Sequence, residues 1–132
     1  MAESEVMQIY LLKAEESLAG AESEFINARY NNAANRCYYA CFQAAIAALL
    51  QAGVQPSGRQ WGHEFVQARF VGELVNRRKL YPATLRQTLS NTLGLRQTAD
   101  YSEDRLNQRE AAHALRWTRP FIEAVQRVGE RP

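Results

Sequence analysis

The stretch that decides the fold is Asn31–Gly53, with the sequence NNAANRCYYACFQAAIAALLQAG. No charged residue lies between Arg36 and Arg59, and alanine, cysteine, leucine and aromatic side chains occupy every face of a helix wound through it. This pattern predicts a helix that is buried all round. The fourteen residues from Cys37 to Leu50 are too few to cross a bilayer. We therefore expect the central helix of a bundle that makes no membrane contact.

Arg36 is the unusual residue of this stretch, because a guanidinium near the start of a buried helix is costly unless it is paired. We predict that Arg36 is buried and bonded to a carboxylate or to backbone carbonyls. Asp100 is the preferred partner, since no other acid lies at a predicted helix end facing the central helix. Asp100 is also four residues after Arg96, so a local pair within one helix is the alternative.

The length of 132 residues fits a single domain spanning 1–132. The two cysteines, Cys37 and Cys41, are four apart in one helix and are expected to be small buried thiols, not a disulfide or a metal pair. His63 and His113 lack the spacing of metal ligands, so we expect neither a metal nor a cofactor. The N-terminus is acidic where a signal peptide would be basic, and a cytoplasmic protein is expected.

Charge is distributed unevenly along the chain. Residues 1–28 hold one lysine and six glutamates, whereas residues 29–132 hold fifteen basic and eight acidic residues. This asymmetry suggests an acidic outer helix and a basic face that meets an acidic partner or nucleic acid. An ordinary solvated surface is the alternative, because no dense basic run exists beyond residues 77–79.

Apolar periodicity and capping signals predict five mostly antiparallel helices and no strand. Pro82 suits the first position of the fourth helix. Asp100 with Glu103 resembles a capping box for the fifth helix, Ser102 is an equal candidate cap, and Pro120 should kink that helix or start its final segment. The predicted ranges are 3–29, 31–53, 61–79, 82–99 and, from the cap onward, to about 128.

The segment LRQTADY, residues 95–101, clusters an arginine, a carboxylate and a phenol at a helix end. Arginine forks suit phosphate oxygens, so Arg36, Arg96 and Tyr101 are predicted to line a polar cleft that binds a phosphate-bearing ligand. Tyr39 and Asp100 are further candidates for ligand binding. The alternative is purely architectural, in which these residues tie helix ends together.

His63, predicted near the start of the third helix, is a candidate general base for cutting RNA. In that reaction a 2′-hydroxyl attacks its own phosphate while an arginine stabilises the developing charge. A surface histidine at a helix N-terminus is the alternative. Tyr38, Tyr39 and Phe42 share the buried helix and are more typical of a core than of a base-stacking platform.

Together these segments resemble the HEPN domain family. The resemblance is carried by AEESL at residues 14–18, the stretch 28–50, a lone His63 and RQTADY at 96–101, within about residues 11–127. It implies a four- to five-helix up-and-down antiparallel bundle that is usually a homodimer. It also implies a partner, since such domains are commonly paired with a minimal nucleotidyltransferase in toxin–antitoxin modules.

Many members of the family are metal-independent ribonucleases that use an arginine followed after four to six residues by a histidine. Here Arg96 matches the arginine, but Tyr101 stands where the histidine is expected. Two functions follow from the resemblance. The first is a dimeric module that binds RNA or a nucleotide, or engages a nucleotidyltransferase. The second is a ribonuclease with a rearranged site, whose catalytic candidates are Arg96, Tyr101 and His63. The dimer interface is expected at the ends of the second and fourth helices, with Gly72 and Gly94 allowing close approach.

Overall fold

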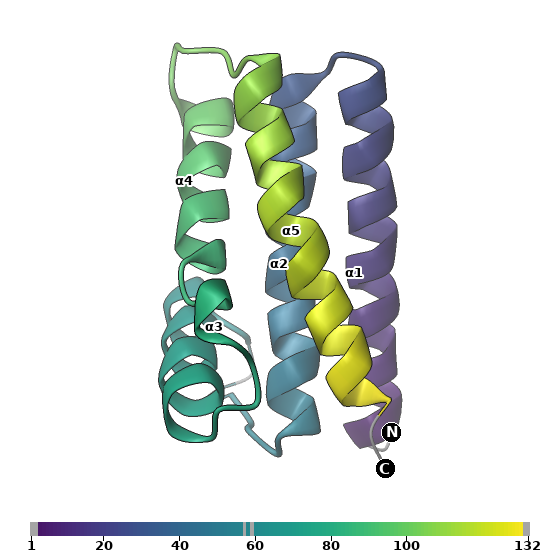
Figure 1. Cartoon of the computed structure of the whole chain (residues 1–132), viewed down its shortest axis with the longest axis vertical. Helices are drawn as coiled ribbons and strands as arrows, with labels where there is room; N and C mark the ends of the chain where they lie inside the picture. The colour runs from purple at the N-terminus through teal and green to yellow at the C-terminus, as the bar shows by residue number, and fades with distance from the viewer. Residues whose placement is uncertain (1–2, 57, 59, 131–132) are drawn as a thin grey trace.

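Five α-helices, one π-helix and one 3₁₀ turn form the protein in a computed structural model that describes residues 3–56, 58 and 60–130 (Figure 1). Within these residues there is no strand, and the predicted all-α bundle is confirmed. The elements are α1 (Glu3–Ile26), α2 (Tyr30–Gln51), α3 (His63–Arg69), the π-helix η1 (Phe70–Arg77), the 3₁₀ turn η2 (Ala83–Leu85), α4 (Thr88–Tyr101) and α5 (Gln108–Gly129).

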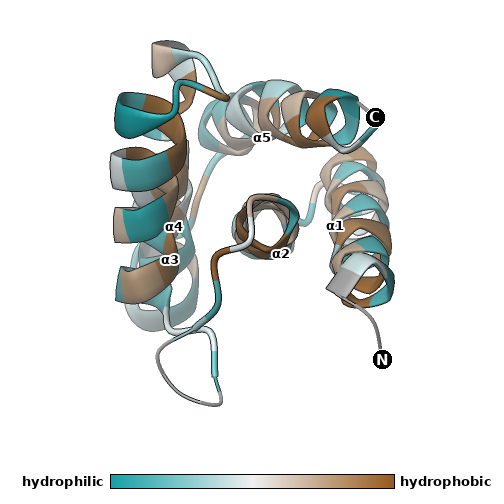
Figure 2. Cartoon of the chain, turned by 90° about the horizontal axis from the view of Figure 1, so that it is seen from below, coloured by the Kyte–Doolittle hydropathy of each residue, from teal (hydrophilic) through white to brown (hydrophobic). Residues whose placement is uncertain are grey.

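Helix α2 is the centre of the bundle, as its sequence predicts. Figure 2 shows it end-on, with α1, α5 and the α3–α4 layer on three sides of it. Most of its residues from Ala33 to Leu50 are buried, including both cysteines. Its remaining face is partly open and carries Arg36, Tyr39 and Gln43, so α2 is not buried all round. Within the described residues, no helix is both long and apolar enough to cross a membrane.

The turn between α1 and α2 comes earlier in the chain than predicted. Helix α1 ends at Ile26, and Ala28 adopts a left-handed φ of 60°, which lets α2 begin at Tyr30. At the other end of α2, Gly53 has a φ of 79°, a conformation that glycine adopts without steric cost. The prediction that Gly53 ends this helix is confirmed.

The third and fourth helices are shorter and less regular than their predicted ranges. The third begins at His63 and changes to π-helical winding over Phe70–Arg77. Pro82 does not open the fourth helix, because it precedes the isolated 3₁₀ turn η2, and α4 starts only at Thr88. These interruptions bring Phe70 against both Tyr81 and Phe121, with ring centroids 5.1 and 4.8 Å apart.

The predicted cap of the fifth helix is wrong. The cap is Asn107, whose Oδ1 accepts from the Glu110 backbone N–H at 2.8 Å, while the Glu110 carboxylate accepts from the Asn107 N–H at 3.1 Å. This is a complete capping box six residues beyond Tyr101. Asp100 lies inside α4 instead, and α5 continues through Pro120 as one helix.

The prediction for Arg36 is also wrong. Its side chain is exposed, and its aliphatic carbons lie 4.0 Å from the position a Cβ would take at Gly20 of α1. The stem of Arg36 thus lies near α1, while its guanidinium extends into solvent. The carboxylate of Asp100 is instead bound by Arg96 and Asn35.

Candidate functional site

The candidate site lies where α2, α3 and α4 meet, and its central residue is Arg96. The guanidinium carbon of Arg96 lies 5.1 Å from the ring centroid of Tyr39 and 5.5 Å from that of Tyr38. Only 14% of the Arg96 side chain is exposed. Cation–π contacts strengthen when the cation is desolvated, so the two rings of α2 hold this arginine in a defined position.

Asp100, one turn further along α4, partly neutralises Arg96. Its Oδ2 lies 3.4 Å from Arg96 Nε and accepts a 2.9 Å hydrogen bond from the Asn35 amide of α2. The Asp100 carboxylate is therefore oriented from two sides. The alternative pairing named from the sequence, a local Arg96–Asp100 pair, is the one that forms.

The contact between Arg96 and Asp100 is electrostatic. The 3.4 Å contact with Asp100 is an ion pair without hydrogen-bond geometry, and the buried Nε finds no hydrogen-bond acceptor within the described residues. Buried donors are rarely left in this state. The arrangement therefore holds a positively charged group between two aromatic rings, with its buried Nε beside the Asp100 carboxylate.

His63, the first residue of α3, packs against the same aromatic rings. Its ring centroid lies 4.7 Å from that of Phe42 and 5.4 Å from that of Tyr38, and its Nδ1 is hydrogen-bonded to the Tyr38 hydroxyl. Desolvation, and then the positive charge of Arg96, lower the pKa of His63 below its usual range. His63 is consequently neutral at pH 7, and Tyr38 connects it to Arg96.

The protonation of Tyr38 decides which nitrogen of His63 carries the proton. Burial raises the pKa of Tyr38 to about 12, so its hydroxyl keeps its hydrogen. Tyr38 is only 2% exposed, and His63 Nδ1 is the acceptor that the described residues offer to that hydrogen. The hydroxyl therefore donates to Nδ1, and Nε2 of the neutral ring carries a hydrogen. In this state His63 presents an N–H donor and not a basic lone pair.

The other predicted residues lie outside this cluster. Tyr101, at the end of α4, is 77% exposed. Arg36 lies in the groove between α1 and α2, a hollow of about 750 Å³ that also contains Lys13 and Gln43. The structure thus brings together Arg96, Asp100, His63 and Tyr39. Among the described contacts, none joins Tyr101 or Arg36 to these four residues.

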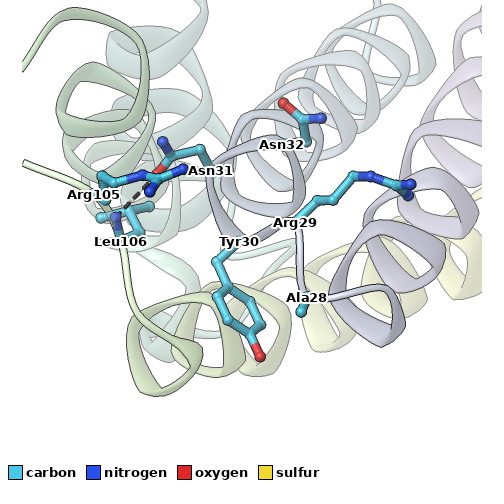
Figure 3. A pocket seen from close by; sticks show the side chains of 7 residues that line it. All are labelled: Ala28, Arg29, Tyr30, Asn31, Asn32, Arg105 and Leu106. Carbon is cyan, nitrogen blue, oxygen red and sulfur yellow. Dashed lines mark hydrogen bonds between the residues drawn. The ribbon is translucent and has the colours of Figure 1, made fainter.

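A separate hollow of about 520 Å³ lies at the end of the bundle, between the α1–α2 turn and the loop before α5 (Figure 3). Asn31 Oδ1 accepts a hydrogen bond from the Leu106 N–H at 3.0 Å and ties this loop to α2. The hollow contains two arginines, but Figure 3 shows that Arg29 points away from Arg105. Their charges do not converge on one point, so this hollow is a weaker candidate for anion binding.

Sequence reasoning missed two polar groups of the cluster. Tyr38 was expected in the core, which is confirmed, but its hydroxyl also bonds His63. Asn35 was not singled out, although it lies four positions before Tyr39 and therefore on the same face of α2. Both hydrogen bonds join residues that are more than twenty positions apart in the sequence. Helical periodicity carries no information about such contacts.

Comparison with known proteins gives two findings. The sequence matches the HEPN domain family over residues 7–128. It is also 27% identical over 129 residues to a protein of Methanocaldococcus jannaschii named "Putative toxin MJ0605", an alignment that covers 94% of this chain and 89% of that protein. The family match begins in α1 and ends in α5, and so includes every element of the bundle. The chain therefore belongs to the HEPN domain family.

Proposed function

We propose that this protein is a toxin-like HEPN module of the cytoplasm that binds a phosphate-bearing ligand, RNA or a nucleotide, at the cluster of Arg96 and His63. The observation that carries this proposal is the position of Arg96, a permanent positive charge that is held on two aromatic rings. The resemblance to a protein named as a toxin supports the toxin-like role.

The chemistry of the cluster suits an anionic group such as phosphate better than a cation. Arg96 supplies permanent positive charge, and His63 supplies a neutral N–H donor beside it. Asp100 offsets part of the charge and is oriented by Asn35, so it cannot readily turn away. A site whose single arginine has part of its charge neutralised by a carboxylate is expected to bind RNA or a nucleotide weakly, with an affinity that depends markedly on salt concentration.

Binding is favoured over cleavage because the lone pair that a general base needs is already occupied. His63 Nδ1 accepts from Tyr38, and Nε2 carries a hydrogen. Tyr101, which stands at the place of the motif histidine, has a largely exposed side chain.

A metal-independent ribonuclease is the second candidate function. It is favoured by one observation, namely that His63 and Arg96 both contact the Tyr38 ring, which places a neutral histidine near the arginine. Catalysis would require the Tyr38–His63 hydrogen bond to reverse, so that Nε2 becomes the free acceptor.

The test is binding of a labelled single-stranded RNA, measured by fluorescence anisotropy at several salt concentrations. We expect Arg96→Ala to weaken binding about tenfold or more and to reduce the salt dependence by about one phosphate contact. The matched control is Arg116→Ala, which removes an exposed arginine of α5. Equal effects of the two substitutions would contradict a site at Arg96.

Cleavage is assayed in parallel in the presence of a chelator. RNA cleavage by the parent protein that is abolished by His63→Ala would replace the binding module with the ribonuclease. Tyr38→Phe separates the two cases further, because it removes the hydroxyl that occupies Nδ1 and keeps the ring. If the hydroxyl only blocks the base, this variant should cleave faster than the parent.

We further propose that the protein is a homodimer and that a minimal nucleotidyltransferase is its partner. The dimer proposal is supported by Gly72 and Gly94, which are exposed and have no described atom within 4 Å of the position of a Cβ. These glycines are therefore not required for packing inside one protomer. Sedimentation at micromolar concentration should give a species of twice 15.0 kDa, and a stable monomer would contradict the dimer. Co-purification with a nucleotidyltransferase encoded beside this gene tests the partner.

A further inference from the structure

The Arg96 cluster consists of Arg96, Asp100, His63, Tyr38 and Tyr39. A hollow of about 370 Å³ adjoins it on the open face of α2. Its volume lies within the range of small-molecule sites, and aromatic rings dominate its lining. The lining residues are Tyr10 of α1, Tyr39, Phe42, Gln43 and Ile46 of α2, and Gln60 and Trp61 before α3. Such a lining offers flat apolar faces, with two side-chain amides at its border.

The hollow and the Arg96 cluster share two rings. Tyr39 lines the hollow and lies 5.1 Å from the Arg96 guanidinium carbon. Phe42 also lines the hollow, and its ring lies 4.7 Å from that of His63. A ligand whose anionic group binds Arg96 can therefore place a neighbouring flat group in the hollow without crossing open surface.

From this continuity we infer that the hollow receives an unpaired nucleobase, stacked on the Tyr39 and Trp61 side of the pocket, while the attached phosphate binds at Arg96. The inference rests on the proposed function and specifies its ligand. Aromatic side chains stack on any base, because every base has a π-face. A base in a duplex has both faces covered by its neighbours, so the ligand must be single-stranded or a free nucleotide.

The charges beyond the hollow fit a continuing strand. Gln43 lines both this hollow and the groove between α1 and α2, which contains Lys13 and Arg36. Lys13 Nζ lies 5.4 Å from the centroid of the Tyr10 ring. Positive groups thus flank the aromatic hollow on two sides, although Glu16 reduces the charge of the groove. This arrangement favours RNA over an isolated nucleotide.

Trp61 provides a direct reporter of occupancy. The chain has two tryptophans, and Trp117→Phe leaves Trp61 as the only one. We would titrate this variant with a short single-stranded oligoadenylate, an abasic strand of equal length, the oligoadenylate annealed to its complement, and adenosine monophosphate. Anisotropy measures binding of the labelled strands, and tryptophan emission measures entry into the hollow.

We expect the oligoadenylate to quench Trp61, and the abasic strand to bind more weakly without quenching. The duplex should not quench. Trp61→Ala should weaken oligoadenylate binding roughly fivefold or more and leave binding of the abasic strand unchanged. Trp61→Phe retains a ring and should keep most of the affinity, which separates loss of stacking from loss of folding. Tyr30→Ala, which removes an aromatic ring that lines a different hollow, should have no effect.

Two negative results have different meanings. If the oligoadenylate binds in an Arg96-dependent way but neither quenches Trp61 nor responds to Trp61→Ala, the base-binding hollow is refuted and the proposed function stands. If no strand binds, or Arg96→Ala has no effect, the proposed function itself is refuted. Equal quenching by adenosine monophosphate and the oligoadenylate would keep the hollow but overturn the preference for RNA. An equal loss of affinity for Tyr30→Ala and Trp61→Ala would overturn the hollow.

Discussion

Removing the carboxylate of Asp100 tests the architecture that holds Arg96. Asp100→Ala deletes an ion pair between residues four apart, which contributes about 0.3–0.5 kcal/mol in a helix. It also deletes the hydrogen bond from Asn35, and bonds to charged groups contribute about 1.5–3 kcal/mol. The lower end applies because the Asp100 side chain is 28% exposed.

One term acts in the opposite direction. Asp100 is in the last turn of α4, where a negative charge opposes the helix dipole by about 0.3–1 kcal/mol, and the substitution relieves this repulsion. We therefore expect Asp100→Ala to lower the free energy of unfolding by about 1–2 kcal/mol. A fully buried pair would be expected to lose about 3–5 kcal/mol.

Urea unfolding at neutral pH measures this loss, with the slope of the transition compared to check that the unfolded states match. Asp104→Ala is the control, because it removes an exposed carboxylate from the loop that follows α4. Asn35→Ala should reproduce most of the loss. A change below about 0.5 kcal/mol for Asp100→Ala would show that the carboxylate does not hold the cluster together.

Further predictions concern individual titrating groups and one turn. Arg96→Ala should raise the pKa of His63, because it removes a positive charge that lowers this pKa. An NMR titration measures the change, with the other histidine as internal reference. In the unfolded chain His63 takes up a proton near its ordinary pKa of 6.5, whereas in the folded protein its pKa is lower. The unfolded state therefore binds more protons below about pH 6.5, and the stability of the fold should fall as the pH drops through this value. His63→Gln should reduce that dependence, and an unchanged profile would contradict it. Burial raises the pKa of Cys37 to about 11 and of Cys41 to about 12, so neither thiol should react with a thiol reagent at pH 8 until the protein is unfolded. Gly53→Ala should destabilise the fold by about 1 kcal/mol in thermal unfolding, because its φ of 79° disfavours a side chain.

The helical architecture could be predicted because it depends on local patterns. The apolar composition of α2 and the glycine at its end identify a central helix without any knowledge of its neighbours. The start of α5 could not be placed as reliably. Asp100, Ser102 and Asn107 are all of residue types that commonly cap helices, and only Asn107 does so here. Asp100 instead forms an ion pair with Arg96, a contact that the sequence does not reveal.

The candidate site was predictable only in part, because it depends on which helix faces project together. Arg96, Asp100 and His63 could be named as polar residues near helix ends, and Tyr39 as an aromatic residue of the central helix. Arg36 is exposed because it lies on the face of α2 that the other helices leave partly open. The pattern of α2 alone does not reveal which of its faces the other helices cover.

The double role of Tyr38 limits how this protein can change over evolutionary time. Its ring belongs to the core, while its hydroxyl is hydrogen-bonded to His63 and its ring face lies against Arg96. Substitutions that alter packing at this position therefore also alter the recognition chemistry at the surface. Stability and ligand preference should drift together in relatives of this chain, and variation at position 38 should be accompanied by variation at positions 63 and 96.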